Sequence, residues 1–445
     1  MSVRSGAWER MDDDVRSAMI ECGKENWTGI YDGVATKNKQ WRPLRPPVMT
    51  REEYDEVTAL TARLAGLVLD ACRRRAATAG ELRERLGVPA GLIEFLDEDA
   101  PLTEDLVVAV RPDVLMSGGV PRFVECNVDS ALGGAFDSDG IARRFLAAYT
   151  GHGITGSVPL DVPASAVDTR FQAMRDQLGL ADGATSVILF HMGSDYPDTQ
   201  DGHTLIELLA PVRDRGRAMG LDVVVYPLEW LTLSDGRLCA GETVLDSVLR
   251  MFIPQEVPHG SGYDALVTAM RTGTVGMFTP SATWLLANKA TFAWLWEDVD
   301  SLSSSDAAVV RAHVPFTSLL TDAGLVADRR QELVLKPTGT YGGSGVVVGR
   351  EVSQAAWESA LRAAVAVGGH IVQEYVPVDR LDMHFVDVAS GAVREAEVPY
   401  CVAPYLFGGR AAGAYLRFAV PDAVSGSIVN LGQGALTSGL LLVDN

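Results

Sequence analysis

Apolar residues recur at helical spacing over the first part of this chain. Between residues 51 and 96 they return every three or four positions, which predicts helices packed on a core. Thr50 followed by Glu53 predicts a capping box at the start of the first of them. Two β-rich runs then flank Ser117-Gly118-Gly119, and this pattern predicts a β-hairpin within residues 105–129.

The second half of the chain mixes helical and β-strand patterns of apolar residues. Residues 185–253 alternate apolar runs with a helical stretch from about Thr204 to Met219, which is typical of a βαβ unit. From Thr279 onward the pattern predicts a helix through ANKATFAWLWEDV, another from about Ala355 to Val367, the strand HIVQEYV and further strands to the end. The chain is therefore expected to be a mixed α/β protein.

Composition narrows the class of protein. The 445 residues are 47% apolar with a mean hydropathy of +0.11, which predicts a globular chain with large cores. The N-terminal stretch MSVRSGAWERMDDDVRS is too polar for a signal peptide, so we expect a cytoplasmic protein. Five scattered cysteines indicate reduced thiols, and a formal charge of −20 argues against nucleic acid or an anionic membrane as partner.

The segment LVLKPTGTYGGSGVVVG, residues 333–349, has the composition of a phosphate-binding loop. Its lysine precedes its glycines and ends a strand, so the segment is neither a P-loop nor a Rossmann turn. Glycines let backbone N–H groups approach phosphate oxygens closely, and Lys336 would add a positive charge. A plain glycine-rich hairpin has the same pattern. The candidate phosphate contacts are Lys336, Gly339, Tyr341, Gly342, Gly343 and Ser344.

Two other segments favour a nucleotide-binding site over a plain glycine-rich hairpin. The apolar strand HIVQEYVP suddenly carries Gln373, Glu374 and Tyr375, as needed to read an adenine edge and a ribose. Lys289 follows Asn288 at the start of a predicted helix, where a solvated surface lysine is the simpler interpretation.

Together these motifs resemble the ATP-grasp superfamily. More narrowly, Asn288-Lys289, the Lys336 glycine loop and Gln373-Glu374-Tyr375 resemble the circularly permuted branch typified by the synthetase domain of glutathionylspermidine synthase. The resemblance implies an α/β (α+β) ATP-grasp fold in permuted order. It also implies that the magnesium carboxylates lie near the N-terminal part of the chain. The Cys/His amidase domain of the bifunctional enzyme has no counterpart, and nothing specifies a glutathione or spermidine pocket.

The predicted hairpin carries the residues that this permutation requires. Arg111 and Asp113 are two positions apart on one strand, as are Glu125 and Asn127 on the other. A three-residue turn, Gly118 to Val120, would place Asp113 opposite Glu125 and Arg111 opposite Asn127, with all four on one face. Asp113, Glu125 and Asn127 offer the hard oxygens that Mg²⁺ prefers, and Arg111 offers a fork to a transferring phosphoryl group. The alternative is a polar, solvent-facing side of a hairpin.

The resemblance implies four regions along the chain. They are a helical N-terminal region (1–104), a metal-binding hairpin segment (105–150), a small α/β domain like the pre-ATP-grasp domain (151–278) and a nucleotide-binding region with a glycine-rich lid (279–445).

The activity implied is that of an ADP-forming carboxylate–amine ligase, which makes an amide or peptide bond on a small molecule through an acyl phosphate. ATP and two Mg²⁺ ions would be required, with Lys289 and Lys336 on the α- and β-phosphates. The expected partners are a small-molecule carboxylate and an amine. A phosphotransferase and a non-catalytic ATP-binding regulator remain alternatives. The complete set of Asp113, Glu125 and Asn127 favours the ligase over a nucleotide sensor.

Further candidates lie outside these motifs. Arg417 interrupts an apolar strand, where the family has an arginine that contacts phosphate or the acyl intermediate, and Ser130 with Gly133 follows the metal pair as a candidate substrate loop. Asp246 and Arg250 are spaced for an ion pair on one helix face. Cys126 is expected to be buried on the opposite side of its strand from the metal residues.

Overall fold

The computed structural model describes residues 6–34, 38–193, 202–420 and 434–444. Its largest sheet is antiparallel and follows the order β1-β17-β18-β19-β20, with β3 joined to β18 and β4 joined to β3. The strands are β1 (Trp41–Pro43), β3 (Ala109–Ser117), β4 (Val120–Val128), β17 (Arg380–Asp387), β18 (Val393–Phe407), β19 (Arg410–Phe418) and β20 (Leu436–Ser438). The predicted hairpin, β3 and β4, is thus one arm of this sheet.

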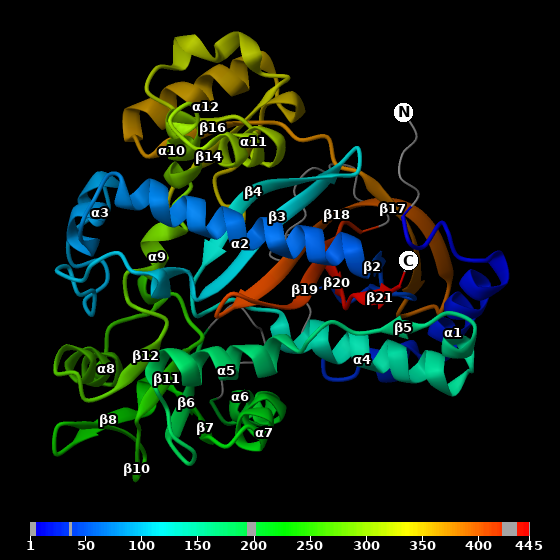
Figure 1. Ribbon diagram of the computed structural model, residues 1–445, viewed down its shortest axis with the longest axis horizontal. Helices are drawn as coiled ribbons and strands as arrows, with labels where there is room; N and C mark the ends of the chain where they lie inside the picture. Colours follow the sequence, from blue (N-terminus) through cyan, green and yellow to red (C-terminus); the bar gives the residue numbers. More distant parts are fainter. Residues whose placement is uncertain (1–5, 35–37, 194–201, 421–433, 445) are drawn as a thin grey trace.

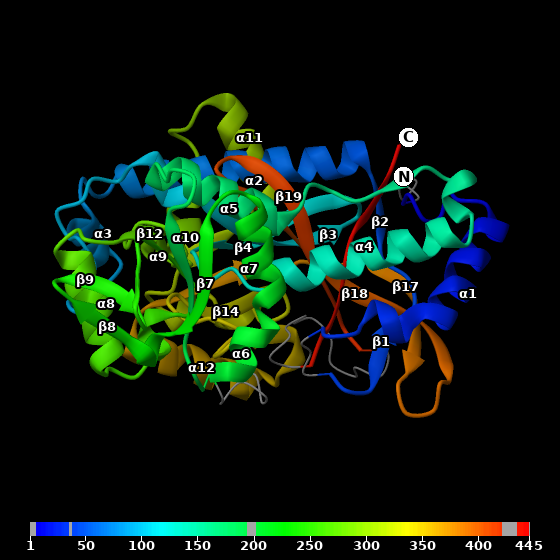
Figure 2. The same ribbon diagram turned by 90° about the horizontal axis from the view of Figure 1, so that it is seen from below.

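Helices cover both faces of the large sheet because strand side chains alternate between faces. On one face, Val402 and Leu416 pack with Tyr54 of α2 (Arg51–Arg73). On the other, Ala403 packs with Phe171 of α5 (Ala166–Leu178) in the cluster that also contains the start of α4 (Ala135–Gly151). Figure 2 shows α4 extending from the middle of the molecule to α1 (Asp13–Ile30).

The predicted capping box at the start of α2 is present. The Thr50 hydroxyl accepts a hydrogen bond from the Glu53 amide at 3.1 Å, and the Glu53 carboxylate accepts one from the Thr50 amide at 2.8 Å. The rest of residues 51–96 contains one further helix, α3 (Ala79–Arg85), followed by turns.

A parallel sheet in the order β12-β11-β6-β7 forms the α/β region. It comprises β6 (Thr185–Phe190), β7 (Asp222–Pro227), β11 (Ser247–Arg250) and β12 (Gly276–Phe278), with α6 (Gly202–Leu208), α7 (Ala210–Ala218) and α8 (Ser261–Arg271). The helix predicted from Thr204 to Met219 is therefore two helices. The break is at Leu209, because Pro211 lies in the first turn of the second helix and cannot donate a backbone N–H to the first.

The nucleotide-type motifs fold as a separate layer. Its sheet has the order β13-β16-β14-β15, and Leu335, Val372, Trp357 and Leu361 form a core between this sheet and α12. The elements are α9 (Thr283–Leu286), α10 (Ala290–Asp298), α11 (Ser304–His313), β13 (Thr317–Leu319), β14 (Leu333–Pro337), β15 (Val347–Val348), α12 (Gln354–Val367) and β16 (His370–Glu374). Figure 1 shows this layer at one end of the molecule, the parallel sheet at the opposite end, and the β3–β4 hairpin between them.

Short strands complete the fold. A small sheet in the order β2-β21-β5 joins distant parts of the chain, and β8, β9 and β10 form another sheet beside α8. Their bounds are β2 (Val48–Thr50), β5 (Leu160–Asp161), β8 (Leu231–Ser234), β9 (Arg237–Ala240), β10 (Thr243–Val244) and β21 (Leu441–Val443). In the described part of the chain, no helix combines the length and apolar character needed to cross a membrane. Residues 1–5 of the N-terminal stretch considered above lie outside the described residues.

Candidate nucleotide and metal site

The hairpin has the predicted register at the end away from its turn, but its turn has a different length from the one predicted. Arg111 lies opposite Asn127, and Asp113 lies opposite Glu125. The predicted three-residue turn is wrong, because Ser117 pairs with Val120 across a two-residue turn. Gly118 and Gly119 have φ values of 59° and 75°, which suits the tight hairpin turn that glycine pairs favour.

A β-bulge restores the register that the shorter turn would have shifted. Pairing passes from Asp113–Glu125 directly to Val114–Phe123, so Val124 is the extra residue. A bulge frees backbone groups from the strand ladder. The Val124 carbonyl accepts a hydrogen bond from the Lys336 ammonium at 3.2 Å. The bulge therefore connects the hairpin to the glycine-loop strand.

Lys336 is buried at the end of β14, with a relative exposure of 9%. Its ammonium donates to the Gln373 side-chain oxygen at 2.7 Å, and the Gln373 amide donates in turn to the Thr317 hydroxyl at 3.1 Å. Burial lowers the pKa of Lys336 to about 8, and the charge of nearby Glu125 opposes this only in part. Within the described residues, the hydrogen-bond acceptors of this buried cation are neutral oxygens.

Lys289 approaches the same hairpin from the start of α10. Its ammonium lies 3.3 Å from the Glu125 carboxylate and donates to the Thr340 carbonyl at 2.6 Å. Its backbone N–H donates to the Thr338 carbonyl at 2.9 Å. Lys289 is only 7% exposed, so the solvated surface lysine considered above is not what the structure contains. This lysine ties the glycine loop to the hairpin.

The glycine loop is folded rather than extended. Gly342, Gly343 and Gly345 all have positive φ, and the Thr340 hydroxyl donates to the Ser344 carbonyl at 2.9 Å. Tyr341 packs against the main apolar core, and burial raises its pKa. No atom lies within 4 Å of the position that a Cβ on Gly339 would take, so the loop is open on that side.

Asp113 pairs with Arg417, a contact that links the hairpin to β19. The carboxylate and guanidinium are 2.6 Å apart, and the Asn127 amide donates to the same carboxylate at 3.4 Å. Burial acts to raise the pKa of Asp113, but the charges of Arg417 and Arg111 outweigh it and hold the pKa below its ordinary value. Arg417 also donates to the Cys401 sulfur at 3.2 Å.

Arg111 holds the segment that follows the hairpin. Its guanidinium donates to the Gly133 carbonyl at 2.8 Å, and the Tyr405 hydroxyl donates to the same oxygen at 2.6 Å. The Arg111 Nε has no hydrogen-bond partner within the described residues. Ser130 is fully buried, and among these residues its hydroxyl has no partner either. The candidate substrate loop thus lies directly against the hairpin face.

The three residues Gln373, Glu374 and Tyr375 point to different surroundings. Gln373 faces inward to Lys336, as described above. The Glu374 carboxylate is exposed, lies 3.5 Å from the Arg122 guanidinium and accepts from the Phe316 amide at 3.4 Å. The Arg350 guanidinium lies over the Tyr375 ring at 3.6 Å from its centroid. Strand alternation separates Gln373 from Glu374 and explains this division.

Asp129 and Arg250 form an ion pair that no local sequence pattern indicates. These side chains are 2.7 Å apart and mostly buried, while Asp246 pairs with Arg237 at 3.1 Å. The predicted helical pair of Asp246 and Arg250 is wrong, because Arg250 ends the strand β11. Cys126 is 3% exposed and packs in the main core, as predicted.

The oxygen atoms of the hairpin suit a metal ion that is also coordinated by a bound nucleotide. Within the described residues, no three His, Cys, Asp or Glu side chains group closely enough to cage a metal ion. Asp113, Glu125 and Asn127 supply two carboxylates and one amide on adjacent strands. Mg²⁺ is commonly held by one or two carboxylates together with substrate phosphates and water. These residues therefore suit a magnesium–nucleotide complex better than a metal held by protein alone.

A search of solved structures identifies the fold. A glutathione synthetase-like effector from Globodera pallida, in its apo form, matches with a TM-score of 0.59 at 12% identity, covering 98% of both chains. The chain has an ATP-grasp-type fold. At this identity the likeness shows the fold alone.

Two further structures give lower scores. They are a putative γ-glutamylcysteine synthetase from Methylobacillus flagellatus (TM-score 0.42, 10% identity, 88% of this chain and 89% of that one) and D-alanyl-alanine synthetase A from Vibrio cholerae (TM-score 0.29, 14% identity, 49% and 68%). These scores carry no argument. No protein-family model and no curated protein sequence matches the chain.

Proposed function

We propose that this protein is an ATP-dependent, ADP-forming carboxylate–amine ligase that makes an amide or peptide bond on a small molecule through an acyl phosphate. One observation carries the proposal. Two buried lysines from the nucleotide-type layer converge on the hairpin that bears the metal-type oxygens, Lys289 at the Glu125 carboxylate and Lys336 at the Val124 carbonyl. The ATP-grasp-type fold supports it.

The chemistry needs an activated acid. A carboxylate oxygen attacks the γ-phosphorus, the bond from that phosphorus to the β-phosphate oxygen breaks, and ADP leaves. The amine nitrogen then attacks the acyl carbon, phosphate departs and the nitrogen loses a proton. Lys289 and Lys336 would hold the nucleotide phosphates, and the Arg111 guanidinium would stabilise the negative charge of the transferring phosphoryl group. Magnesium bound through Asp113, Glu125 and Asn127 would neutralise charge on the phosphates.

Water must be kept from the acyl phosphate. The glycine loop is already tied to Lys289 through the Thr338 and Thr340 carbonyls, and Tyr341 is packed into the core beside it. We infer that this loop is the lid that closes over the reacting groups. Because the hairpin precedes both lysines in the chain, we also infer the circularly permuted motif order, with the four regions expected from the sequence.

The test combines the protein with ATP, Mg²⁺ and a matrix of small carboxylic acids and amines, and measures ADP release and product mass. ADP with a product equal to acid plus amine minus water is expected. AMP would contradict the mechanism. ADP from one substrate alone, with a stable phosphorylated product, would indicate a phosphotransferase.

A matched pair of variants locates the chemistry. Glu125→Gln should lower kcat by about 100-fold or more at saturating Mg²⁺, because it removes a carboxylate that would hold the magnesium neutralising the phosphates. Glu397→Gln, at an exposed position of β18, is the control and should retain wild-type kcat. Full activity of Glu125→Gln with unchanged Mg²⁺ dependence would remove the hairpin from the mechanism.

A further inference from the structure

A cavity of about 600 Å³ lies beside the loop that follows the hairpin. It opens at the carboxyl ends of the parallel strands β6 and β11, the edge where open α/β sheets bind ligands. Its volume is within the usual range for small-molecule sites. Its walls come from loop 131–134, the start of α4, α5, α6, α7 and the segment after β11.

The walls are predominantly apolar, and among the described residues Asp137, His191 and Glu256 are the polar side chains that line the cavity besides Arg170. Aliphatic and aromatic side chains from every bounding element line the cavity: Leu132, Phe136, Phe171, Ile188, Phe190, Leu205, Leu209, Val212, Leu249, Met251 and Ile253. Polar or charged ligand groups placed against such walls would lose their hydration without gaining hydrogen bonds. An apolar ligand body would instead gain from leaving water.

Arg170 of α5 is a buried cation in this wall, with a relative exposure of 6%. Its guanidinium donates to the Leu132 carbonyl at 2.5 Å and to the Met251 sulfur at 3.5 Å. Its Nε has no hydrogen-bond partner within the described residues. Arg250 and Arg417 each face a carboxylate, at 2.7 and 2.6 Å, but the partners of Arg170 are neutral. A buried charge without a counter-charge attracts an anion.

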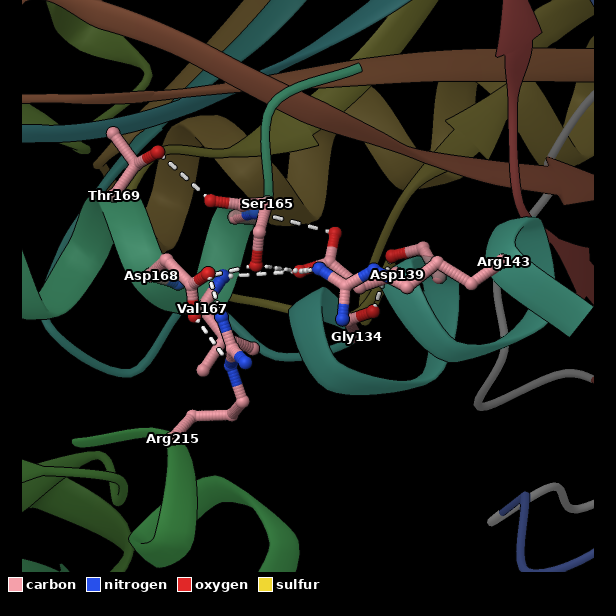
Figure 3. Close-up of polar contacts among 10 residues, drawn as sticks. Gly134, Asp139, Arg143, Ser165, Val167, Asp168, Thr169 and Arg215 are labelled. Atoms are coloured by element: carbon pink, nitrogen blue, oxygen red, sulfur yellow. Dashed lines mark hydrogen bonds and ion pairs between the residues drawn. The ribbon is translucent and has the colours of Figure 1, made fainter. Parts of the chain in front are cut away.

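The start of α5 is fixed, so Arg170 is held in place. The Ser165 hydroxyl accepts from the Asp168 amide at 3.2 Å and donates to the Asp139 carboxylate at 2.7 Å. Asp139, on α4, also accepts from the Val167 amide at 3.1 Å, as Figure 3 shows. These contacts join α4 to α5 one turn before Arg170. A side chain placed this way loses little freedom when it binds a ligand.

One loop separates the cavity from the hairpin. The Leu132 carbonyl accepts from Arg170, and the adjacent Gly133 carbonyl accepts from Arg111. Both residues of the loop also line the cavity. A carboxylate beside Arg170 would therefore lie next to the hairpin face on which the phosphoryl group is transferred.

From this arrangement we infer that the cavity binds the acid substrate, that the acid has an aromatic or branched aliphatic body, and that Arg170 binds its carboxylate. The inference rests on the proposed function and specifies its substrate class. Asp137 and Glu256 also line the cavity, so the preference for an acid over an amine is what the amine probe below tests.

Binding is measured by calorimetry with ADP and Mg²⁺ present. The probes are 3-phenylpropanoate, 4-methylpentanoate, glutarate and 3-phenylpropylamine. The first two combine an apolar body with a carboxylate, glutarate lacks the apolar body, and the amine carries the opposite charge. The first two should bind about ten-fold or more tightly than the last two. Equal or tighter binding of glutarate or of the amine would overturn the inference.

Variants place the ligand in the cavity. Val212→Trp should fill the cavity and abolish binding of 3-phenylpropanoate, whereas Val367→Trp, at an 81% exposed position on α12, should not. Arg170→Met should remove the preference for the acid over the amine, and Arg170→Lys should partly restore it. Unchanged affinity in Val212→Trp would overturn the inference even if Arg170→Met fails to fold.

ADP release separates the two proposals. In one outcome, apolar acids bind to the wild type but not to Val212→Trp, and yet give no ADP with any amine. That result would support the cavity as an apolar-acid site and refute the proposed ligase activity. Turnover of polar acids with a KM that Val212→Trp leaves unchanged would uphold the ligase and refute the cavity.

Discussion

Replacing Lys336 with methionine tests whether the buried ammonium serves a ligand or the fold. The pKa of Lys336 falls from 10.5 to about 8, which corresponds to about 3 kcal/mol against the charged form at neutral pH. Methionine keeps most of the volume and removes the charge. It leaves the Gln373 and Val124 oxygens without their donor, at a cost of about 1–2 kcal/mol. We therefore expect Lys336→Met to equal the wild type in stability, or to exceed it by up to about 2 kcal/mol.

The pH dependence provides an independent check. Because the folded pKa of Lys336 lies below the unfolded one, the unfolded chain binds more protons between pH 8 and pH 10.5. This group therefore makes the wild type more stable as pH rises through that window, and Lys336→Met should lack the contribution. Urea unfolding at pH 7, 8, 9 and 10 measures both chains, with surface Lys24→Met as the control that keeps the wild-type slope.

Nucleotide binding completes the test. ATP with Mg²⁺ should raise the melting temperature of the wild type and of Lys24→Met, but not that of Lys336→Met. A variant destabilised by more than about 2 kcal/mol at pH 7 would show that Lys336 is needed by the fold. An ATP-dependent shift equal to that of the wild type would refute the assignment of Lys336 to the phosphates.

Two further predictions concern the framework of the site. Arg417→Met should destabilise the protein by about 3–5 kcal/mol in urea unfolding, because it leaves Asp113 buried without its partner, and adding Asp113→Asn should recover most of that loss; additive losses would contradict the pairing. Gly134→Ala should cost about 2 kcal/mol or more, since Gly134 has a φ of 82° and a Cβ there would lie 2.4 Å from the Tyr415 ring. Gly133→Ala, with nothing within 4 Å, is the control.

Local patterns were sufficient for the parts of the fold governed by neighbouring residues. The capping box at Thr50 and the hairpin follow from spacing and strand alternation, whereas the pairing of Asp113 with Glu125 also depends on the bulge. The bulge at Val124 did not follow, because two turn lengths with compensating registers give the same apolar pattern. The glycine pair at Gly118 was the available signal for the shorter turn.

Contacts between segments far apart in the chain could not be predicted from local sequence patterns. Arg417 reaches Asp113 from a strand three hundred residues later, and Arg250 reaches Asp129 from the parallel sheet. The spacing of four between Asp246 and Arg250 fits a helix as well as a turn residue followed by a strand, which is what the structure contains. The cavity could not be anticipated either, since each of its walls is an ordinary apolar face until the elements pack.

Transfer of oxygen from the acid to phosphate is the most direct measurement of the central claim. The acid found in the ADP-release screen is labelled with ¹⁸O in its carboxylate, turned over with ATP, Mg²⁺ and the amine, and the released inorganic phosphate is analysed by mass spectrometry. Activation as an acyl phosphate predicts one ¹⁸O atom in that phosphate for each amide formed. Unlabelled phosphate, or AMP as the nucleotide product, would contradict the account.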